Sequence, residues 1–72
     1  MPRGPQLPGE RVEADLRRRI AADEWQSGDL LPTVAELAEA YGVGRATVSR
    51  ALRRIAEDGL LVIRSRWGVF RA

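Results

Sequence analysis

Hydrophobic residues recur at helical spacing in three separate stretches of the chain. In the first stretch, Val12, Leu16 and Ile20 lie four residues apart among charged residues, a pattern that predicts an amphipathic helix over about residues 9–23. Trp25 follows the end of this stretch. A single large aromatic side chain at that position is expected to close the helix end as part of the core.

The second stretch begins with a capping signal. Thr33 is followed three residues later by Glu36, a spacing at which each side chain can accept a hydrogen bond from the backbone of the other. Gly42 can take the left-handed conformation that ends a helix, and only two residues separate it from the third stretch. The apolar residues at helical spacing within this helix are Leu37, Ala38 and Tyr41. A helix, a short glycine-containing turn and a second helix form the helix-turn-helix unit.

The third stretch predicts a helix over about residues 45–58 with two chemically distinct sides. The apolar side consists of Val48, Ala51, Leu52 and Ile55. The polar side consists of Arg45, Ala46, Thr47, Ser49, Arg50, Arg53 and Arg54. In a helix-turn-helix, the polar side of the second helix is the side that enters the major groove of DNA.

The arginines of this third helix differ in their opportunities to pair. Arg53 and Arg54 each have an acidic residue four positions later, with which they can form helix-stabilising ion pairs. Arg45 and Arg50 have no acidic residue three or four positions away, and cations early in a helix oppose its dipole. Two interpretations follow: the polar side is an ordinary solvated surface, or its unpaired arginines meet an anion outside the chain.

A second run of arginines, residues 17–19, has the opposite setting. Glu13 and Asp15 lie three or four residues before them, at the spacing that brings opposite charges together on a helix. We therefore expect these arginines to form an ion-paired, solvent-facing side of the first helix.

The end of the chain predicts a β-hairpin. Asp58 and Gly59 stop the third helix, after which residues 60–64 predict a strand. Residues 65–68 predict a tight loop and residues 69–71 the returning strand. A basic hairpin that follows a recognition helix is the wing of a winged helix, and its tip can reach a phosphate or an adjacent minor groove.

The predicted fold is mainly α with a small β-hairpin, a winged helix-turn-helix of three helices plus a wing. Residues 1–8 are rich in proline and glycine and are expected to be a flexible arm, so the domain covers residues 9–72. Between the first two helices, residues 27–29 predict a turn. Leu30 and Leu31 then predict a short extended segment before a proline.

Composition excludes several classes of function. The 72 residues contain no cysteine and no histidine, which leaves out disulfide frameworks, thiol catalysis and the usual zinc sites and acid–base chemistry. No apolar run is long enough to span a membrane or to form a signal-peptide core. We therefore expect a cytoplasmic protein that is not an enzyme. It is expected to have no cofactor, metal or membrane partner, and no small-molecule pocket within this chain.

Charge is distributed unevenly along the chain. The net charge is only +2, but residues 1–44 contain five arginines against eight acidic residues, a net charge of −3. Residues 45–72 contain seven arginines against two acidic residues, a net charge of +5. The positive part is the part that would face DNA in this motif.

These segments resemble the N-terminal DNA-binding domain of the GntR family of bacterial transcription regulators over roughly residues 10–71. The matching pieces, in order and at the family's spacing, are G-D-L-L-P-T-V-A-E-L-A, Y-G-V-G-R-A-T-V-S-R-A-L, D-G-L-L-V-I-R and G-V-F. The resemblance implies a homodimer on double-stranded DNA with a palindromic operator. It also implies a C-terminal domain that binds an effector and dimerises, and we expect that domain to lie outside this chain.

The resemblance also implies which residues contact DNA. Arg45 and Thr47 match base- and phosphate-contacting positions, and Ser49 matches a further contacting position. Ser65 and Arg66 match the wing tip that enters the minor groove. The full set of predicted DNA-contacting residues is Thr33, Gly44, Arg45, Ala46, Thr47, Ser49, Arg50, Arg53, Arg64, Ser65, Arg66, Trp67 and Gly68. Arg45 is the best candidate for a bidentate contact with guanine.

Three departures from the family pattern bear on the operator sequence. Residues 34–35 are Val-Ala where the family often has an acidic residue and an arginine. Gly44 replaces the usual serine or threonine, and residues 66–69 replace the wing's usual G-x-G-T. Trp67 in this loop either meets the minor groove, by stacking on sugar or acting as a wedge, or folds back over the hairpin.

We predict a sequence-specific, DNA-binding transcriptional regulator, expected to be a repressor. Its recognition helix at about residues 45–58 would lie in the major groove, and its wing at about residues 61–71 would lie at the minor groove or the backbone. Two alternatives remain open. One is a small recombination or architectural factor that bends DNA, and the other is a winged helix whose arginine face contacts an acidic protein.

Overall fold

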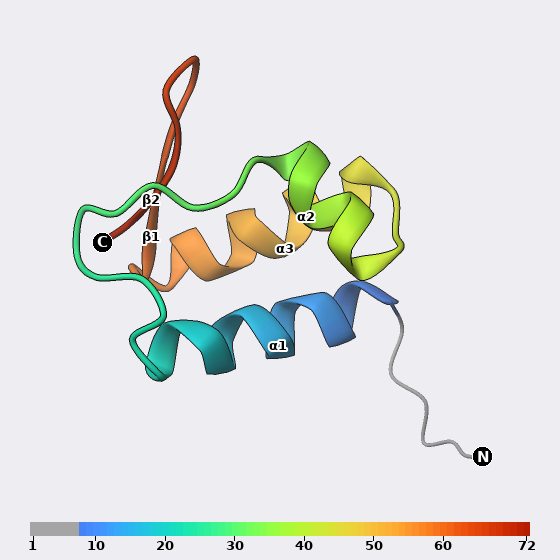
Figure 1. The fold of residues 1–72 in the computed structure, drawn as a ribbon, viewed down its shortest axis with the longest axis horizontal. Coiled ribbons are helices and arrows are strands. Elements are labelled where there is room, and N and C mark those ends of the chain that lie inside the picture. The colour runs from blue at the N-terminus through green and yellow to red at the C-terminus, as the bar shows by residue number, and fades with distance from the viewer. Residues whose placement is uncertain (1–7) are drawn as a thin grey trace.

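The structure, a computed structural model, describes residues 8–72, so residues 1–7 of the predicted arm lie outside the described part. Its elements in chain order are α1 (Pro8–Ala21), α2 (Val34–Tyr41), α3 (Arg45–Glu57), β1 (Leu61–Arg64) and β2 (Gly68–Arg71) (Figure 1). This order confirms the predicted fold of three helices followed by a hairpin. Within residues 8–72, no helix combines the length and the apolar character needed to cross a membrane.

The two ends of α1 differ slightly from the prediction. The helix begins at Pro8, because a proline in the first turn lacks an amide hydrogen that would otherwise remain unpaired. It ends at Ala21 rather than near Asp23, so the predicted end was wrong. The cause is the backbone of Asp23, which has a left-handed φ of 59° that no right-handed helix can contain.

The helix-turn-helix forms as its capping residues predict. The backbone N–H of Glu36 donates to the Thr33 hydroxyl at 3.1 Å, and the backbone N–H of Thr33 donates to the Glu36 carboxylate at 2.8 Å. Gly42 ends α2 with a φ of 68°, a conformation that glycine adopts without strain. The backbone N–H of Val43 then donates to the Ala38 carbonyl at 3.0 Å, which confirms the predicted tight turn into α3.

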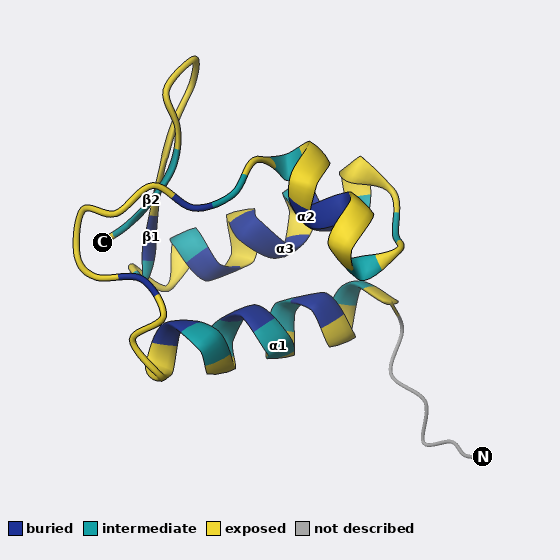
Figure 2. Ribbon diagram, in the orientation of Figure 1, coloured by how far each residue is buried: buried dark blue, intermediate teal, exposed yellow. Residues whose placement is uncertain are grey.

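The core lies between the three helices and the base of the hairpin (Figure 2). The predicted apolar positions of the helices are all buried except Tyr41, which is half-buried. The buried core residues are Val12, Leu16, Ile20, Trp25, Leu31, Leu37, Ala38, Val48, Ala51, Leu52, Ile55 and Leu61. Each large aliphatic side chain contributes roughly 1.5–3 kcal/mol of folding free energy when it is fully buried. The cluster therefore fixes the apolar side of α3 in the core, and the polar side of the helix faces solvent.

The hairpin is held to the body of the domain by the segment that precedes α2. Strands β1 and β2 are antiparallel, with Val62 opposite Phe70. Leu30 forms an isolated bridge to Phe70 on the other side of β2, and the backbone N–H of Leu31 donates to the Val69 carbonyl at 2.8 Å. The predicted extended segment is confirmed, and it acts as a third strand from which the far end of the hairpin projects (Figure 1).

Candidate nucleic-acid interface

The polar side of α3 carries arginines that are exposed and make no ion pair. Arg45, Arg50 and Arg53 are exposed, and no carboxylate within residues 8–72 lies in ion-pair distance of them; we call these three the open arginines. Among the other predicted contact residues of this helix, Ala46 is exposed whereas Thr47 and Ser49 are half-buried. The structure therefore brings together the helical part of the predicted set on one surface.

The positive charge at the start of α3 is not compensated by the residues around it. Gly44 precedes the helix with an extended backbone and supplies no side-chain hydrogen bond to the first turn. That turn contains no acidic residue and begins with Arg45. Its backbone N–H groups and the guanidinium therefore present positive charge in the same place, a setting that attracts an anion.

The second half of α3 pairs differently from the prediction. The expected pairs within the helix are absent from residues 8–72: Arg53 has no ion pair, and Arg54 lies 3.9 Å from Glu13 of α1. Asp58, expected to pair with Arg54, instead receives Arg17 of α1 at 2.6 Å. The pairs that the spacing allowed therefore do not form within residues 8–72. For Arg54 and Asp58 the reason is that α1 and α3 lie side by side, so contacts between the helices replace those along α3.

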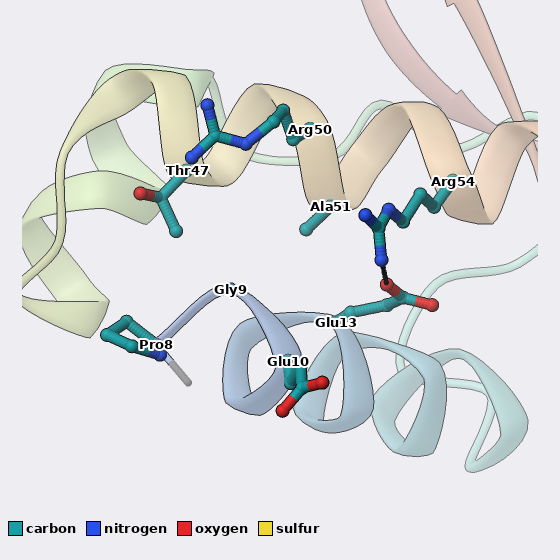
Figure 3. Close-up of a pocket in the computed structure, with 8 residues that line it drawn as sticks. All are labelled: Pro8, Gly9, Glu10, Glu13, Thr47, Arg50, Ala51 and Arg54. Carbon is teal, nitrogen blue, oxygen red and sulfur yellow. Dashed lines mark ion pairs between the residues drawn. The ribbon is translucent and has the colours of Figure 1, made fainter. Parts of the chain in front are cut away.

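A groove separates the first turn of α1 from the exposed side of α3 (Figure 3). Its volume is about 360 Å³, and it is lined by Pro8, Gly9, Glu10, Glu13, Thr47, Arg50, Ala51 and Arg54. The Thr47 methyl group lies close to the start of α1, since a Cβ placed on Gly9 would lie 3.7 Å from it. Thr47 therefore faces the edge of the groove, whereas Arg50 extends along it toward the start of α3 (Figure 3).

The arginines at positions 17–19 of α1 are all paired, as predicted; we call Arg17, Arg18 and Arg19 the paired arginines. Arg17 contacts Glu13 at 2.9 Å, and Arg18 pairs with Asp15. The partner of Arg19 differs from the predicted Asp15. Arg19 instead pairs with Glu24, which lies beyond the end of the helix, at 2.6 Å.

Arg19 also joins the end of α1 to α2. Its guanidinium lies 4.7 Å from the centre of the Trp25 ring and donates to the Tyr41 hydroxyl at 2.9 Å. Tyr41 in turn donates to Asp15 at 2.5 Å. This hydrogen bond, together with the charges of nearby arginines, lowers the pKa of Asp15, while burial and the bond to Asp15 raise the pKa of Tyr41. The network serves the packing of α1 against α2 and leaves the paired arginines committed to their own chain.

The wing tip is open to solvent on all of its predicted contact residues, which are Arg64, Ser65, Arg66, Trp67 and Gly68. The backbone N–H of Trp67 donates to the Arg64 carbonyl at 3.0 Å and closes the turn. Trp67 is 74% exposed, so the possibility that it folds back over the hairpin is excluded. Arg66 has a φ of 76°, a left-handed conformation that is unusual for a residue with a side chain.

Thr33 caps α2, because its hydroxyl oxygen accepts a hydrogen bond from the backbone N–H of Glu36. A hydroxyl group can donate its hydrogen while it accepts. Thr33 is exposed, so the predicted contact with a phosphate is compatible with the cap.

The fold and this surface define a winged helix-turn-helix regulatory domain. The sequence profile described as "Bacterial regulatory proteins, gntR family" matches residues 8–70, and the chain belongs to this family. The match confirms, at the level of class, the predicted DNA-binding transcriptional regulator and its family.

Two relatives that are named as repressors match most of this chain. The "Histidine utilization repressor" of Klebsiella aerogenes is 36% identical over 63 residues, which are 88% of this chain and 26% of that protein. The "Mannosyl-D-glycerate transport/metabolism system repressor MngR" of Escherichia coli (strain K12) is 44% identical over 46 residues, 64% of this chain and 19% of that protein. The chain thus spans about a quarter or less of the length of these relatives.

Solved structures share the fold closely. The DNA-binding domain of AraR in complex with operator ORE1 superposes with a TM-score of 0.91 at 25% identity, covering 100% of this chain and 89% of that one. The protein titled "Streptococcus agalactiae GntR" gives a TM-score of 0.79 at 33% identity, covering 89% of this chain and 31% of that one.

Sequence reasoning missed two features of this surface. The groove beside Arg50 depends on how α1 crosses α3, and no local pattern reports that crossing. Leu30 lies under the wing so closely that a Cβ on Gly68 would be 2.8 Å from its Cδ1 atom. The only signal for this contact was the glycine itself, since an isolated glycine within a strand often marks a close approach.

Proposed function

We propose that this domain binds double-stranded DNA in a sequence-specific manner and represses transcription. The observation that carries the proposal is the group of open arginines on α3, which have no partner among residues 8–72. The operator-bound AraR domain and the relatives named as repressors support the same conclusion. The domain acts by binding, and no catalytic step is part of the proposal.

Base recognition is assigned to the start of α3. Arg45 would make a bidentate contact with guanine in the major groove, with Ser49 and Arg50 beside it and Ala46 against a thymine methyl group. The exposed, uncapped start of the helix supports this assignment, because a carboxylate from the chain itself would otherwise compete for the guanidinium.

Phosphate contacts are assigned to the edges of this surface. Thr47 is half-buried at the groove beside α1, a position better suited to a backbone phosphate than to a base edge. Thr33, Gly44 and Arg53 would hold the backbone on either side of the recognition helix. In the wing, Arg64, Ser65, Arg66, Trp67 and Gly68 would meet the minor groove or its phosphates.

We further propose that two copies bind a palindromic operator and that the contacts between copies lie outside this chain. A bacterial regulator of this kind would work in the cytoplasm, where the chromosome is. The relatives are about four times as long as the part that matches, which leaves room for such contacts in a longer protein.

The proposal is tested by selecting bound duplexes from a random pool and titrating one selected duplex and one random duplex with parent protein. A preference for the selected duplex supports sequence-specific binding, and a symmetric repeat within the selected sites supports two copies. Binding that depends on salt without any preference among duplexes would instead favour contact with an acidic protein or a general architectural function.

The contact assignments are tested on the same duplexes. Arg66→Ala should weaken binding to both the selected and the random duplex. It should also reduce the slope of log affinity against log salt concentration by about 1, because one phosphate contact is lost. If Arg66→Ala leaves random-duplex binding unchanged, the wing is a structural hairpin and its assignment is wrong.

A further inference from the structure

The wing carries the apolar surface that the core leaves uncovered. Within residues 8–72, the large hydrophobic side chains that remain exposed are Leu30, Val62, Ile63 and Trp67. Three of the four belong to the hairpin, and Leu30 bridges to its second strand. Single exposed hydrophobic residues are common on proteins, but a concentration on one projecting element indicates a surface that is covered in use. Trp67, at the turn, is the largest and the most exposed of them.

The charge of the hairpin indicates the chemistry of its partner. From Gly59 to Ala72 the chain contains three arginines and no acidic residue. Arg64 and Arg66 lie in the turn region with Trp67 and are exposed. A planar apolar side chain among cations suits the minor groove of DNA, where bases can be parted by a wedge and phosphates line both edges.

The backbone of the turn points to a function for its side chains. Arg66 has a left-handed backbone conformation that glycine would adopt without strain. No hydrogen bond joins it to another residue within residues 8–72. An arginine at this position lowers the stability of the hairpin. Its presence is explained if the cation binds something outside the chain.

The base of the wing is held by backbone hydrogen bonds on both sides of β2, so the position of the tip is fixed relative to the helices. On one side β2 pairs with β1, and on the other the backbone N–H of Arg71 donates to the Asp29 carbonyl at 2.8 Å. Leu30 lies directly under Gly68, the residue after Trp67, at a distance that leaves no room for a side chain without rearrangement. A tip held in this way loses little conformational freedom on binding.

We propose that Trp67 is a wedge that enters the minor groove beside the site read by α3, partly unstacks one base step and bends the duplex, with Arg66 holding the wing in the groove. The inference rests on the proposed binding of duplex DNA. A pyrimidine–purine step is the expected point of entry, because such steps unstack easily, and a narrow A·T-rich groove beside it would attract Arg66.

The first test uses the fluorescence of Trp67. The only other tryptophan, Trp25, is 8% exposed. A Trp67→Phe variant measures the emission of Trp25 alone, which is then subtracted from that of the parent. With parent protein and a duplex selected from a random pool, we expect saturating duplex to quench Trp67 emission and to protect it from acrylamide. If Trp67 stays as accessible to acrylamide in the complex as in free protein, the wedge is excluded. Protection that rises with protein concentration in the absence of DNA would assign Trp67 to a contact between copies and also overturn the proposal.

The second test measures bending of the same duplex by energy transfer between dyes at its two ends. Parent protein should bring the ends closer, Trp67→Leu should retain part of the bend, and Trp67→Ala should remove it and weaken binding about tenfold. An unchanged bend with Trp67→Ala would contradict the proposal. Because Trp67 is exposed, these variants should keep the helical content of the parent, which circular dichroism checks.

Arg66→Gly separates a binding function from a structural one. We expect this variant to melt at a higher temperature, since the strained backbone is relieved, and to bind the selected duplex more weakly. Unweakened binding would remove Arg66 from the wedge. Failure of the parent to bind any duplex would defeat the proposed function itself, whereas binding that depends on Arg45 but not on Trp67 would defeat the wedge alone.

Discussion

Two groups of arginines, one on α1 and one on the neighbouring α3, are used in opposite ways in this domain. On α1 each of the paired arginines contacts a carboxylate of its own chain, and Arg19 also joins α1 to Tyr41 of α2. On α3 the open arginines have no such partner within residues 8–72. The number of arginines therefore says little about nucleic-acid binding, whereas the absence of internal partners identifies the side that is available to an external anion.

The largest expected effect is on binding by the open arginines. Arg45→Ala should weaken binding to a selected duplex by about 1–3 kcal/mol, because a bidentate contact with guanine is lost. Arg18→Ala removes the same charge from the paired group and is the matched control, for which we expect a much smaller change. Fluorescence anisotropy titrations at one fixed salt concentration measure both. Equal losses in the two variants would show that only the net charge matters.

The next effect concerns stability and should appear on the other helix. Arg19→Ala should lower the free energy of unfolding by about 1–2 kcal/mol, because it removes charged hydrogen bonds to Glu24 and Tyr41 and the contact with Trp25 in a partly exposed setting. Arg53→Ala, on α3, should change stability little. Urea unfolding followed by circular dichroism gives both values, and a larger loss for Arg53→Ala would reverse the comparison.

A smaller effect tests the two helix starts. Thr33→Ala removes the cap of α2 and should cost about 1 kcal/mol of stability. Gly44→Ser adds a hydroxyl where α3 has none, in an extended backbone with open space around it, and should add roughly a few tenths of a kcal/mol. Thermal unfolding of the two variants beside the parent checks the signs. A loss of stability with Gly44→Ser would mean that the start of α3 is constrained in some other way.

The smallest effect is a dependence on pH that arises where α1 packs against α2. The hydrogen bond from Tyr41 lowers the pKa of Asp15 below its ordinary value of 3.8 in the folded protein. The resulting stability is present above that value and is lost as the pH falls through the folded pKa. In Tyr41→Phe this contribution is reduced, so the free energy of unfolding should decline less steeply between about pH 5 and about pH 2. Parallel declines in parent and variant would contradict the assignment.

Much of the fold followed from local sequence signals, and the exceptions have physical reasons. The capping box at Thr33, the left-handed Gly42 and the apolar stripe of α3 act within a few residues, so the sequence was enough to predict them. The ion pair between Arg17 and Asp58 was missed because it joins residues that are distant in the chain. The end of α1 was misplaced because Asp23 adopts a left-handed backbone, which aspartate tolerates without requiring.

The candidate site divides in the same way. Arg45 and Arg50 were identifiable because the sequence offers them no neighbouring acid, whereas Arg53 has Glu57 four residues later and could equally have been paired. The groove beside Arg50 and the contact between Leu30 and Gly68 depend on how separate elements meet, which periodicity does not encode.

The distinction between the two groups of arginines is tested most directly by the Nε–Hε signals of arginine side chains in nuclear magnetic resonance spectra, recorded before and after addition of saturating duplex. Signals of Arg45 and Arg50 should shift and sharpen as their guanidinium groups become held, while those of Arg17 and Arg19 should stay in place because their carboxylate partners do not change. If saturating duplex left the signals of Arg45 and Arg50 unchanged, or shifted those of Arg17 and Arg19 instead, the claim that the open arginines bind DNA would be contradicted.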